Sequence, residues 1–160
     1  MGTVSSSGPA TSPAVLCRLA EDALDLDAHF DVRRQVFVDL QRLFEGTDRD
    51  DRDMRASTLH VVGVAEGAIA GAVRLYPLDD AGLWQGDRLA VLPDARVRHL
   101  GALLVRFAVA TAGERGGHTM VARIQLPNVR FFEHLGWSSD GPPAPYHGVM
   151  HQPMAIPLAP

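Results

Sequence analysis

Lysine is missing from this chain of 160 residues, and all 15 of its basic residues are arginines. Because Schiff-base enzymes and Walker-type phosphate loops both depend on a lysine amine, the sequence excludes these two kinds of chemistry. A guanidinium group binds carboxylates and phosphates through two parallel hydrogen bonds. We therefore look to arginine side chains and to backbone amides for the binding of anions.

Cysteine, long apolar runs and excess positive charge are also scarce. The single cysteine, Cys17, excludes an internal disulfide and a cysteine-rich zinc site, and we expect a small buried side chain. No apolar run approaches the roughly 20 residues that span a membrane, and the N-terminus lacks a signal-peptide pattern. The formal net charge of −4 argues against a general nucleic-acid binder. These features predict a cytoplasmic protein that binds neither membrane nor nucleic acid.

The sequence pattern predicts one domain. Residues 1–13 are mostly Ser, Gly, Thr and Pro, so we expect a disordered leader, followed by a single domain over residues 14–160. Hydrophobic periodicity predicts strands at 14–19, 59–65, 68–76, 89–92, 119–125 and 149–156, the last interrupted by Pro153. It predicts helices from a cap at Asp25 or Asp27 to Phe44, at 100–113 and at 128–135. A tight turn at Glu66–Gly67 joins two strands, and loops fill 78–86 and 138–145.

The stretch 88–113 organises the chain as a strand, a turn and a helix. Pro93 closes a short apolar run, and from Leu100 apolar residues recur at helical spacing. The first amides of a helix are unpaired and carry partial positive charge, so this turn can hold a phosphate. We expect Arg96 and Arg98 to add positive charge there.

The spacing Arg96-Val-Arg-His-Leu-Gly101 after a strand resembles the coenzyme motif R/Q-x-x-G-x-G/A of the GNAT (GCN5-related) N-acetyltransferases. His99 stands where the family usually has its first glycine. The resemblance implies that acetyl-CoA or another acyl-CoA is bound by Arg96, Val97, Arg98, His99, Leu100, Gly101 and Ala102. It also implies that the backbone of Leu89, Ala90 and Val91 holds the thioester carbonyl.

A second segment, Asn128-Val-Arg-Phe-Phe-Glu-His-Leu-Gly-Trp137, resembles the closing segment of the same family. The resemblance implies that Asn128 and Phe132 contact the coenzyme, Asn128 at the pantetheine amides. Phe132 occupies the position of a tyrosine that often protonates the leaving thiolate. Since phenylalanine has no proton to give, the general acid is unassigned.

Residues nearer the N-terminus, five of them charged, extend the resemblance to a GNAT subgroup and, more distantly, to the acyl-homoserine-lactone synthases. These positions are Arg33, Phe37, Asp50, Asp53, Arg74 and Arg88. With Trp84, they are implied to bind the acceptor. The three arginines either bind an anionic group of the acceptor or pair with the acidic loop at 45–53 and hold it as a lid over the coenzyme pocket.

Three further segments are similar to a narrower GNAT subfamily of unestablished substrate, associated with nitrilase-containing bacterial gene clusters. They are Arg74-Leu-Tyr-Pro77, Trp84-x-Gly-x-Arg-Leu-Ala-Val91 and Tyr146-His-Gly-Val-Met-His151. The family resemblance implies an α+β fold, a mixed sheet of about six to seven strands flanked by helices. The sheet is expected to splay at the coenzyme site, between the strands of Leu89 and Val121.

The implied activity is direct transfer of an acetyl group from acetyl-CoA to a small amine. A base must deprotonate the amine; Asp87 is the first candidate and His147 the second, because an imidazole with a pKa of about 6.5 suits proton transfer near neutrality. Two other functions stay open: an acyl-homoserine-lactone-synthase-like enzyme that takes S-adenosylmethionine, and a non-catalytic acyl-CoA sensor. The histidine spacings match no metal site, so we expect none. An exposed strand at the C-terminal edge would allow a homodimer.

Overall fold

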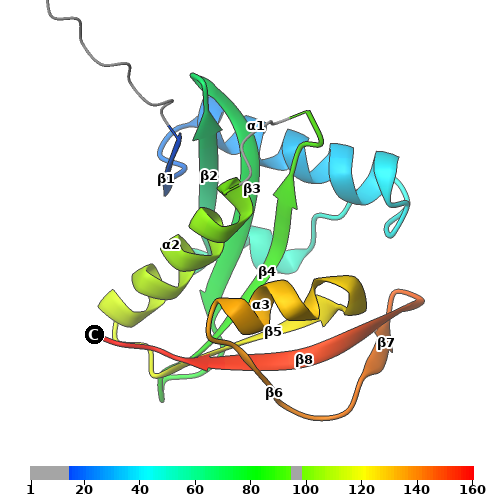
Figure 1. Ribbon diagram of the computed structural model, residues 1–160. Coiled ribbons are helices and arrows are strands. Elements are labelled where there is room, and N and C mark those ends of the chain that lie inside the picture. Colours follow the sequence, from blue (N-terminus) through cyan, green and yellow to red (C-terminus); the bar gives the residue numbers. More distant parts are fainter. Residues whose placement is uncertain (1–14, 95–98) are drawn as a thin grey trace, which may run out of the picture.

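The computed structural model describes residues 15–94 and 99–160 (Figure 1). In these ranges eight strands form one sheet in the order β1-β2-β3-β4-β5-β8-β6, with β7 paired to β8. Only β4 and β5 are parallel neighbours among the described strands, so the sheet is mixed and the predicted α+β fold is confirmed. The predicted leader at 1–13 lies outside the described residues. The strands are β1 (Val15–Leu19), β2 (Leu59–Ala65), β3 (Ala68–Pro77), β4 (Leu83–Val91), β5 (Thr119–Gln125), β6 (Ser138–Ser139), β7 (Ala144–Tyr146) and β8 (Val149–Pro157).

The helices are α1 (Ala23–Arg33), α2 (Leu100–Glu114) and α3 (Val129–His134), with a π-helix η1 (Arg34–Leu40) and two 3₁₀ turns, η2 (Asp51–Met54) and η3 (Leu126–Asn128). The predicted cap of α1 is wrong: Asp22 caps it, because its side chain accepts a hydrogen bond from the Asp25 amide at 2.8 Å. The Asp25 carboxylate pairs instead with Arg18. Arg42 adopts a φ of 53°, so the helix ends before Phe44.

Two strand boundaries correct the sequence prediction. β4 begins at Leu83 rather than at Leu89, because its side chains alternate between a buried face and a polar face that carries Gln85 and Asp87. β8 continues through Pro153. The Pro153 carbonyl accepts from the Asp140 amide at 2.9 Å, so the proline nitrogen faces the gap between β6 and β7, and no ladder bond is lost.

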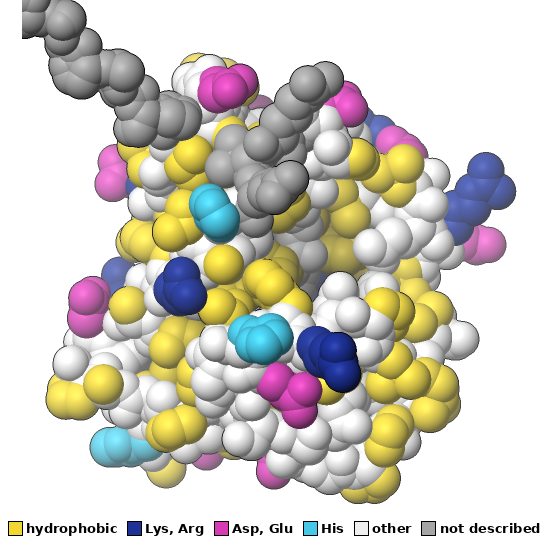
Figure 2. All heavy atoms as spheres, in the orientation of Figure 1, with side chains coloured by type: hydrophobic (Ala, Val, Ile, Leu, Met, Phe, Trp, Pro, Cys, Tyr) yellow, Lys and Arg dark blue, Asp and Glu magenta, His cyan; other side chains and the backbone are white. Residues whose placement is uncertain are grey.

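The two faces of the sheet are covered differently. α2 and α3 lie on one face, and α1 lies on the other (Figure 1). Under α2, Leu100 and Leu104 pack with Val61, Leu75 and Met120 in the main apolar core. Gly63 and Gly71 allow this close approach: an added Cβ would lie 2.8 Å from Leu100 Cδ1 or 2.7 Å from Leu104 Cδ1. Figure 2 shows hydrophobic and neutral side chains with scattered charges on the α2 face.

The α1 face has a smaller apolar cluster. Val32, Val36 and Phe37 pack there on Ala72 of β3 and Ala90 of β4. The rest of this face is polar, and it carries the buried charged groups described below. In the described ranges, no helix is both long and apolar enough to cross a membrane.

β4 and β5 separate halfway along the sheet. They pair only from Leu83–Thr119 to Gln85–Val121, after which β4 continues beside β3 and β5 beside β8. The predicted splay between these strands is therefore present. β4 also bulges: Ala72 pairs with Ala90 and Arg74 with Asp87, which leaves one extra residue on β4, and Arg88 takes a φ of 54°.

Candidate active site

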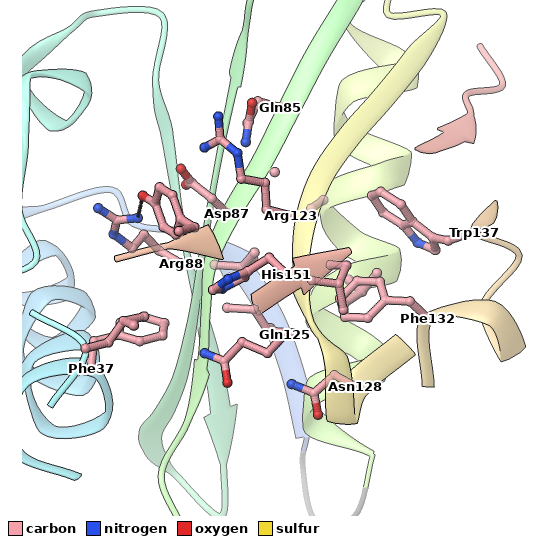
Figure 3. Close-up of a pocket in the computed structure, with 18 of the residues that line it drawn as sticks. Phe37, Gln85, Asp87, Arg88, Arg123, Gln125, Asn128, Phe132, Trp137 and His151 are labelled. Atoms are coloured by element: carbon pink, nitrogen blue, oxygen red, sulfur yellow. Dashed lines mark hydrogen bonds between the residues drawn. The ribbon is translucent and has the colours of Figure 1, made fainter. Parts of the chain in front are cut away.

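A pocket opens at the split between β4 and β5 (Figure 3). Its apolar wall comes from α2, β5, α3 and the short segment after α3, and includes Val105, Ala108, Met120, Phe132 and Trp137. Its polar wall comes from β4, β5 and β8, and includes Gln85, Asp87, Arg88, Arg123, Gln125 and His151. The pocket thus joins the two faces of the sheet through the gap between the strands.

The helix start beside this pocket carries the predicted phosphate-binding segment. Arg96, Val97 and Arg98 lie outside the described residues. His99 is the N-cap of α2 and makes no capping hydrogen bond through its side chain. Leu100 is fully buried in the core, so its contribution to coenzyme binding is limited to the backbone.

Gly101 and Ala102, the other two predicted coenzyme residues, form the first turn of α2 and are partly exposed. A Cβ on Gly101 would meet Phe131 Cζ at 3.7 Å and Val91 Cγ2 at 3.9 Å, which are ordinary contacts. The protein's own packing therefore does not require glycine here. Because Gly101 has no side chain, it leaves room for a bound group outside the first turn of the helix.

The backbone of β4 offers a donor to the split. The Leu92 amide donates to Ala70 O of β3 at 2.9 Å. Since amides alternate in direction along an extended strand, the amide of Val91 points away from β3, toward the open side. Of the three predicted contacts with a thioester carbonyl, the geometry supports that of Val91; by the same alternation the Ala90 amide points toward β3.

Asn128 and Phe132 stand on the opposite side of the split. Asn128 is the N-cap of α3, but its side-chain amide makes no capping hydrogen bond and lines the pocket. Phe132 is buried, with its ring edge-on to Trp137 at 5.4 Å between centroids. The Trp137 Nε1–H has no hydrogen-bond partner among the described residues.

A buried cluster of three arginines and four aspartates lies beside the polar wall. Arg33 is fully buried; it donates to Asp48 Oδ2 at 2.7 Å and to both oxygens of Asp53, at 2.8 and 3.0 Å. Two histidines complete this end of the cluster, His29 at 3.1 Å from Arg33 Nη1 and His60 at 2.9 Å from Asp53 Oδ1. Asp50 and Asp53 also close a capping box on η2.

Arg74 and Arg88 connect this cluster to the pocket. Arg74 binds Asp87 through two hydrogen bonds of 2.7 Å and Asp50 through two, of 2.6 and 3.2 Å. Arg88 donates to the Asp48 carbonyl at 3.0 Å and to its carboxylate at 3.1 Å. Of the two predicted roles for the arginines, pairing with the acidic loop is the one observed. Asp48, Asp50 and Asp53 of the acidic loop do not line the pocket, so the predicted lid over it is not formed by these side chains.

The charge states in the cluster are fixed by these contacts. Burial alone would lower the pKa of Arg74, but hydrogen bonds with Asp87 and Asp50 outweigh it and raise that pKa well above its ordinary value. Burial alone would raise the pKa of Asp53, but hydrogen bonds from His60 and Arg33 hold it well below its usual range. Burial, together with the nearby Arg33 charge, lowers the pKa of His29 to about 3. At neutral pH the aspartate is charged and His29 is neutral.

Some of the predicted site residues line the pocket and others do not. Asp87 lines the pocket from within β4, not from the start of the strand as predicted, and Phe37 also lines it. Trp84 is buried under α2 next to Gly117, and Arg33, Asp50 and Asp53 do not line the pocket. His147 is exposed at the β7–β8 turn, with a φ of 49° and its ring 4.3 Å from that of Phe44.

Several side chains that sequence reasoning did not assign to the site line the pocket, and two of them, His151 and Arg123, bear an imidazole and a guanidinium group. His151 on β8 is 5% exposed, and its Nδ1 lies 2.7 Å from the Val149 carbonyl. Because a carbonyl only accepts, Nδ1 carries the proton, and Nε2 of the neutral ring is left with a lone pair. Figure 3 shows His151 between Arg88 and Phe132. Arg123, the other of these two residues, lies on β5. Among the described residues, no group of three His, Cys, Asp or Glu side chains is arranged to hold a metal ion.

The fold and site together define an open mixed sheet with a pocket at a split between parallel strands. The sequence pattern of the Acetyltransferase (GNAT) family matches residues 25–137, and the chain belongs to this family. It is therefore an enzyme of the N-acyltransferase class, as predicted. No curated protein sequence matches the chain.

Three solved structures share the fold. Escherichia coli ElaA is 19% identical, with a TM-score of 0.78 over 91% of this chain and 99% of that one. An acyl-CoA N-acyltransferase from Pseudomonas aeruginosa is 21% identical, with a TM-score of 0.77 and the same coverage. The CoA-dependent acyl-homoserine lactone synthase BjaI, solved with SAM and isopentyl-CoA, is 17% identical, with a TM-score of 0.73 over 92% and 84%. The narrower resemblance to the nitrilase-associated subfamily stays a prediction.

Proposed function

We propose that this protein transfers an acyl group, most simply acetyl from acetyl-CoA, directly to a small primary amine. The observation that carries the proposal is the pocket at the β4–β5 split, which connects α2, at Val105 and Ala108, with the polar face of the sheet. The donor and the acceptor can therefore approach the same point from opposite faces.

The coenzyme enters from the α2 face. Its pyrophosphate binds the first amides of α2 at His99, Leu100, Gly101 and Ala102, where the helix dipole favours negative charge. The pantetheine arm then passes between β4 and Asn128, whose free amide pairs with an amide of the arm. The apolar wall around Phe132 excludes water from the thioester.

At the acyl carbon, the reaction forms a bond to nitrogen and breaks the bond to sulfur. The neutral amine attacks the thioester carbonyl, and the Val91 amide stabilises the resulting oxyanion. The carbon–sulfur bond then breaks, the acyl group remains on nitrogen, and the proton lost by nitrogen ends on the thiol of the coenzyme. A group that accepts this proton and returns it to the thiolate serves both steps.

Two pocket groups compete for that role. Both oxygens of Asp87 accept hydrogen bonds from Arg74, and Oδ2 also accepts one from the Tyr76 hydroxyl at 3.2 Å. Both carboxylate oxygens are therefore already engaged in hydrogen bonds within the protein. His151 has a free Nε2 in the pocket, so we propose His151 as the proton carrier and Asp87 as the group that attracts the ammonium form of the acceptor.

Calorimetric titration with acetyl-CoA, desulfo-CoA and S-adenosylmethionine tests the function. We expect micromolar binding of acetyl-CoA, weakened at least about 100-fold in Gly101→Glu, because the new carboxylate repels the pyrophosphate. Ala110→Glu, at an exposed position farther along α2, is the control and should bind as wild type. Binding of S-adenosylmethionine alone would replace this proposal with a synthase-like reaction. Acetyl-CoA binding without transfer to any amine would indicate a sensor.

The pH dependence of turnover separates the two bases. We expect His151→Gln to lower kcat by about 100-fold and to remove the acidic limb of the pH–rate profile, since neutral imidazole is the reactive form. Asp87→Asn should raise the KM for the amine and keep the limb. If the limb disappears in Asp87→Asn and persists in His151→Gln, Asp87 is the base.

A further inference from the structure

Arg123 differs from the other charged side chains of the pocket. Asp87 is bound by Arg74, and Arg88 is bound by Asp48 and Asp50. Within the described ranges, Arg123 makes no ion pair and donates no hydrogen bond; its guanidinium lies over the Tyr146 ring, 4.9 Å from the centroid. Residues 1–14 and 95–98 contain no Asp or Glu that could pair with it.

The strand register places Arg123 opposite Asp87. Gln85 of β4 pairs with Val121 of β5, and side chains two residues apart share a face of the sheet. Asp87 and Arg123 are therefore the next pair on the α1 face, across the point where the strands separate. Figure 3 shows Gln85, Asp87 and Arg123 at the same end of the pocket.

The core does not require this arginine. Met120, Ala122 and Ile124 are the buried residues of β5, whereas Arg123 points to the other, exposed side of the strand. An arginine on an ordinary exposed strand face would project into solvent. Here it stacks on an aromatic ring and lines a pocket, which holds the guanidinium ready for a planar anion.

The charges around the two residues have opposite signs. Three arginines and four aspartates make up the cluster that includes Asp87, so it carries a formal charge of −1. Arg123 adds a separate positive charge on the facing strand. A ligand with an ammonium group at one end and a carboxylate at the other matches this pair.

Given the proposed function, on which this step rests, we propose that Arg123 binds a carboxylate of the acceptor. The acceptor class is then that of amino acids and related zwitterions with a free carboxylate. The ammonium group approaches Asp87 and releases one proton to solvent, and after the neutral amine has attacked, His151 takes the second proton and returns it to the leaving thiolate. The carboxylate forms paired hydrogen bonds with Arg123.

The test compares acceptors that differ only in the carboxylate. Transfer from acetyl-CoA is measured as release of the coenzyme thiol, with L-phenylalanine, its methyl ester and 2-phenylethylamine, and with the same three forms of L-methionine. For the wild type we expect kcat/KM to be about 10- to 100-fold higher for the free amino acid than for its ester or amine. In Arg123→Gln the KM for the amino acid should rise by that factor, with kcat nearly unchanged, and the preference should vanish.

Two variants control this result. Arg123→Lys keeps the charge and should keep part of the preference. Arg115→Gln, at an exposed arginine beyond the end of α2, should behave as wild type. Equal rates for all three forms, or an unchanged preference in Arg123→Gln, would overturn the carboxylate site and leave the acyltransferase intact. Acetyl-CoA binding with transfer to none of the six compounds would overturn both. S-adenosylmethionine is itself an amino acid. If the wild type consumes it and Arg123→Gln does not, the carboxylate site at Arg123 stands and the proposed transfer reaction is replaced by a synthase-like one.

Discussion

The two faces of the sheet are stabilised by different interactions. Under α2 the interior is apolar, and helix and strands meet through Leu100, Leu104 and the side chains of β2 to β5. On the α1 face, a small apolar cluster is joined by buried arginines and aspartates. Full burial of a leucine contributes about 1.5–3 kcal/mol, whereas a buried ion pair only offsets the desolvation of its own charges.

The comparison indicates what the charged cluster is for. Its hydrogen bonds connect the polar loop at 45–54 to Arg33, to β3 and to β4. These bonds hold the loop and the two strands in one fixed arrangement. Arg74 and Arg88 also place Asp87 and the bulge of β4 at the pocket. The apolar face supplies stability, and the charged face supplies the position of the polar wall.

The largest predicted effect comes from breaking the cluster at its centre. Arg33→Ala removes the one arginine that bonds both buried Asp48 and Asp53, which keep only their contacts with Arg88, Arg74 and His60. We therefore expect the free energy of unfolding to fall by about 3–5 kcal/mol. The measurement is urea unfolding followed by tryptophan fluorescence. If this variant does not fold, Arg33→Lys, which keeps the charge, should show a smaller loss.

The neighbouring Arg34 is a matched control. It is 51% exposed and pairs with Asp31 and Asp39 at the surface, so Arg34→Ala should cost less than about 1 kcal/mol. If the free energy of unfolding falls by similar amounts in the two variants, the buried ion pairs of Arg33 stabilise the fold no more than the exposed pairs of Arg34.

A smaller effect is expected from pH. The pKa of His29 is lowered to about 3 by burial and by the Arg33 charge, against about 6.5 in the unfolded chain. Below pH 6.5 the unfolded chain therefore binds a proton that the folded chain does not, and the free energy of unfolding falls. Between pH 7.5 and 5 we expect a loss of about 1–2 kcal/mol.

Unfolding of two histidine variants checks the origin of this slope. In His29→Asn the slope over pH 7.5 to 5 should flatten, while the exposed control His118→Asn should keep it. This range lies above the usual pKa of the carboxylates, so Asp53, whose pKa is lowered, adds its own loss only at lower pH. An unchanged slope in His29→Asn would assign the pH dependence to other groups.

Local patterns predicted most of the fold. The bounds of β2 and β5 agree with the prediction, since each is a hydrophobic run between turn residues. The first half of β4 was missed because its polar side chains face the charged cluster. The π-helix, which turns Phe37 toward the pocket, leaves no mark in the hydrophobic spacing.

The site was harder to predict because it depends on strand order. The sequence identified Asp87, Asn128 and Phe132 through the family resemblance, and all three line the pocket. His151 enters the site only because β8 pairs with β5, which sets it opposite Gln125. The same holds for the arginines: which carboxylate each one binds follows from tertiary contacts between distant segments, so the sequence left two roles open.

The smallest predicted effect on stability is at Arg123, which makes no ion pair in the described ranges. Arg123→Gln breaks no ion pair and leaves no carboxylate buried alone, so the free energy of unfolding should change by less than about 0.5 kcal/mol. The same substitution at Arg88, which is 7% exposed and binds Asp48, should cost several times more. Urea unfolding of both variants compares two arginines of the same pocket wall. A large fall in the free energy of unfolding of Arg123→Gln would assign this arginine to the structural cluster. A small fall together with a raised KM for amino acids would show that Arg123 serves binding and not stability.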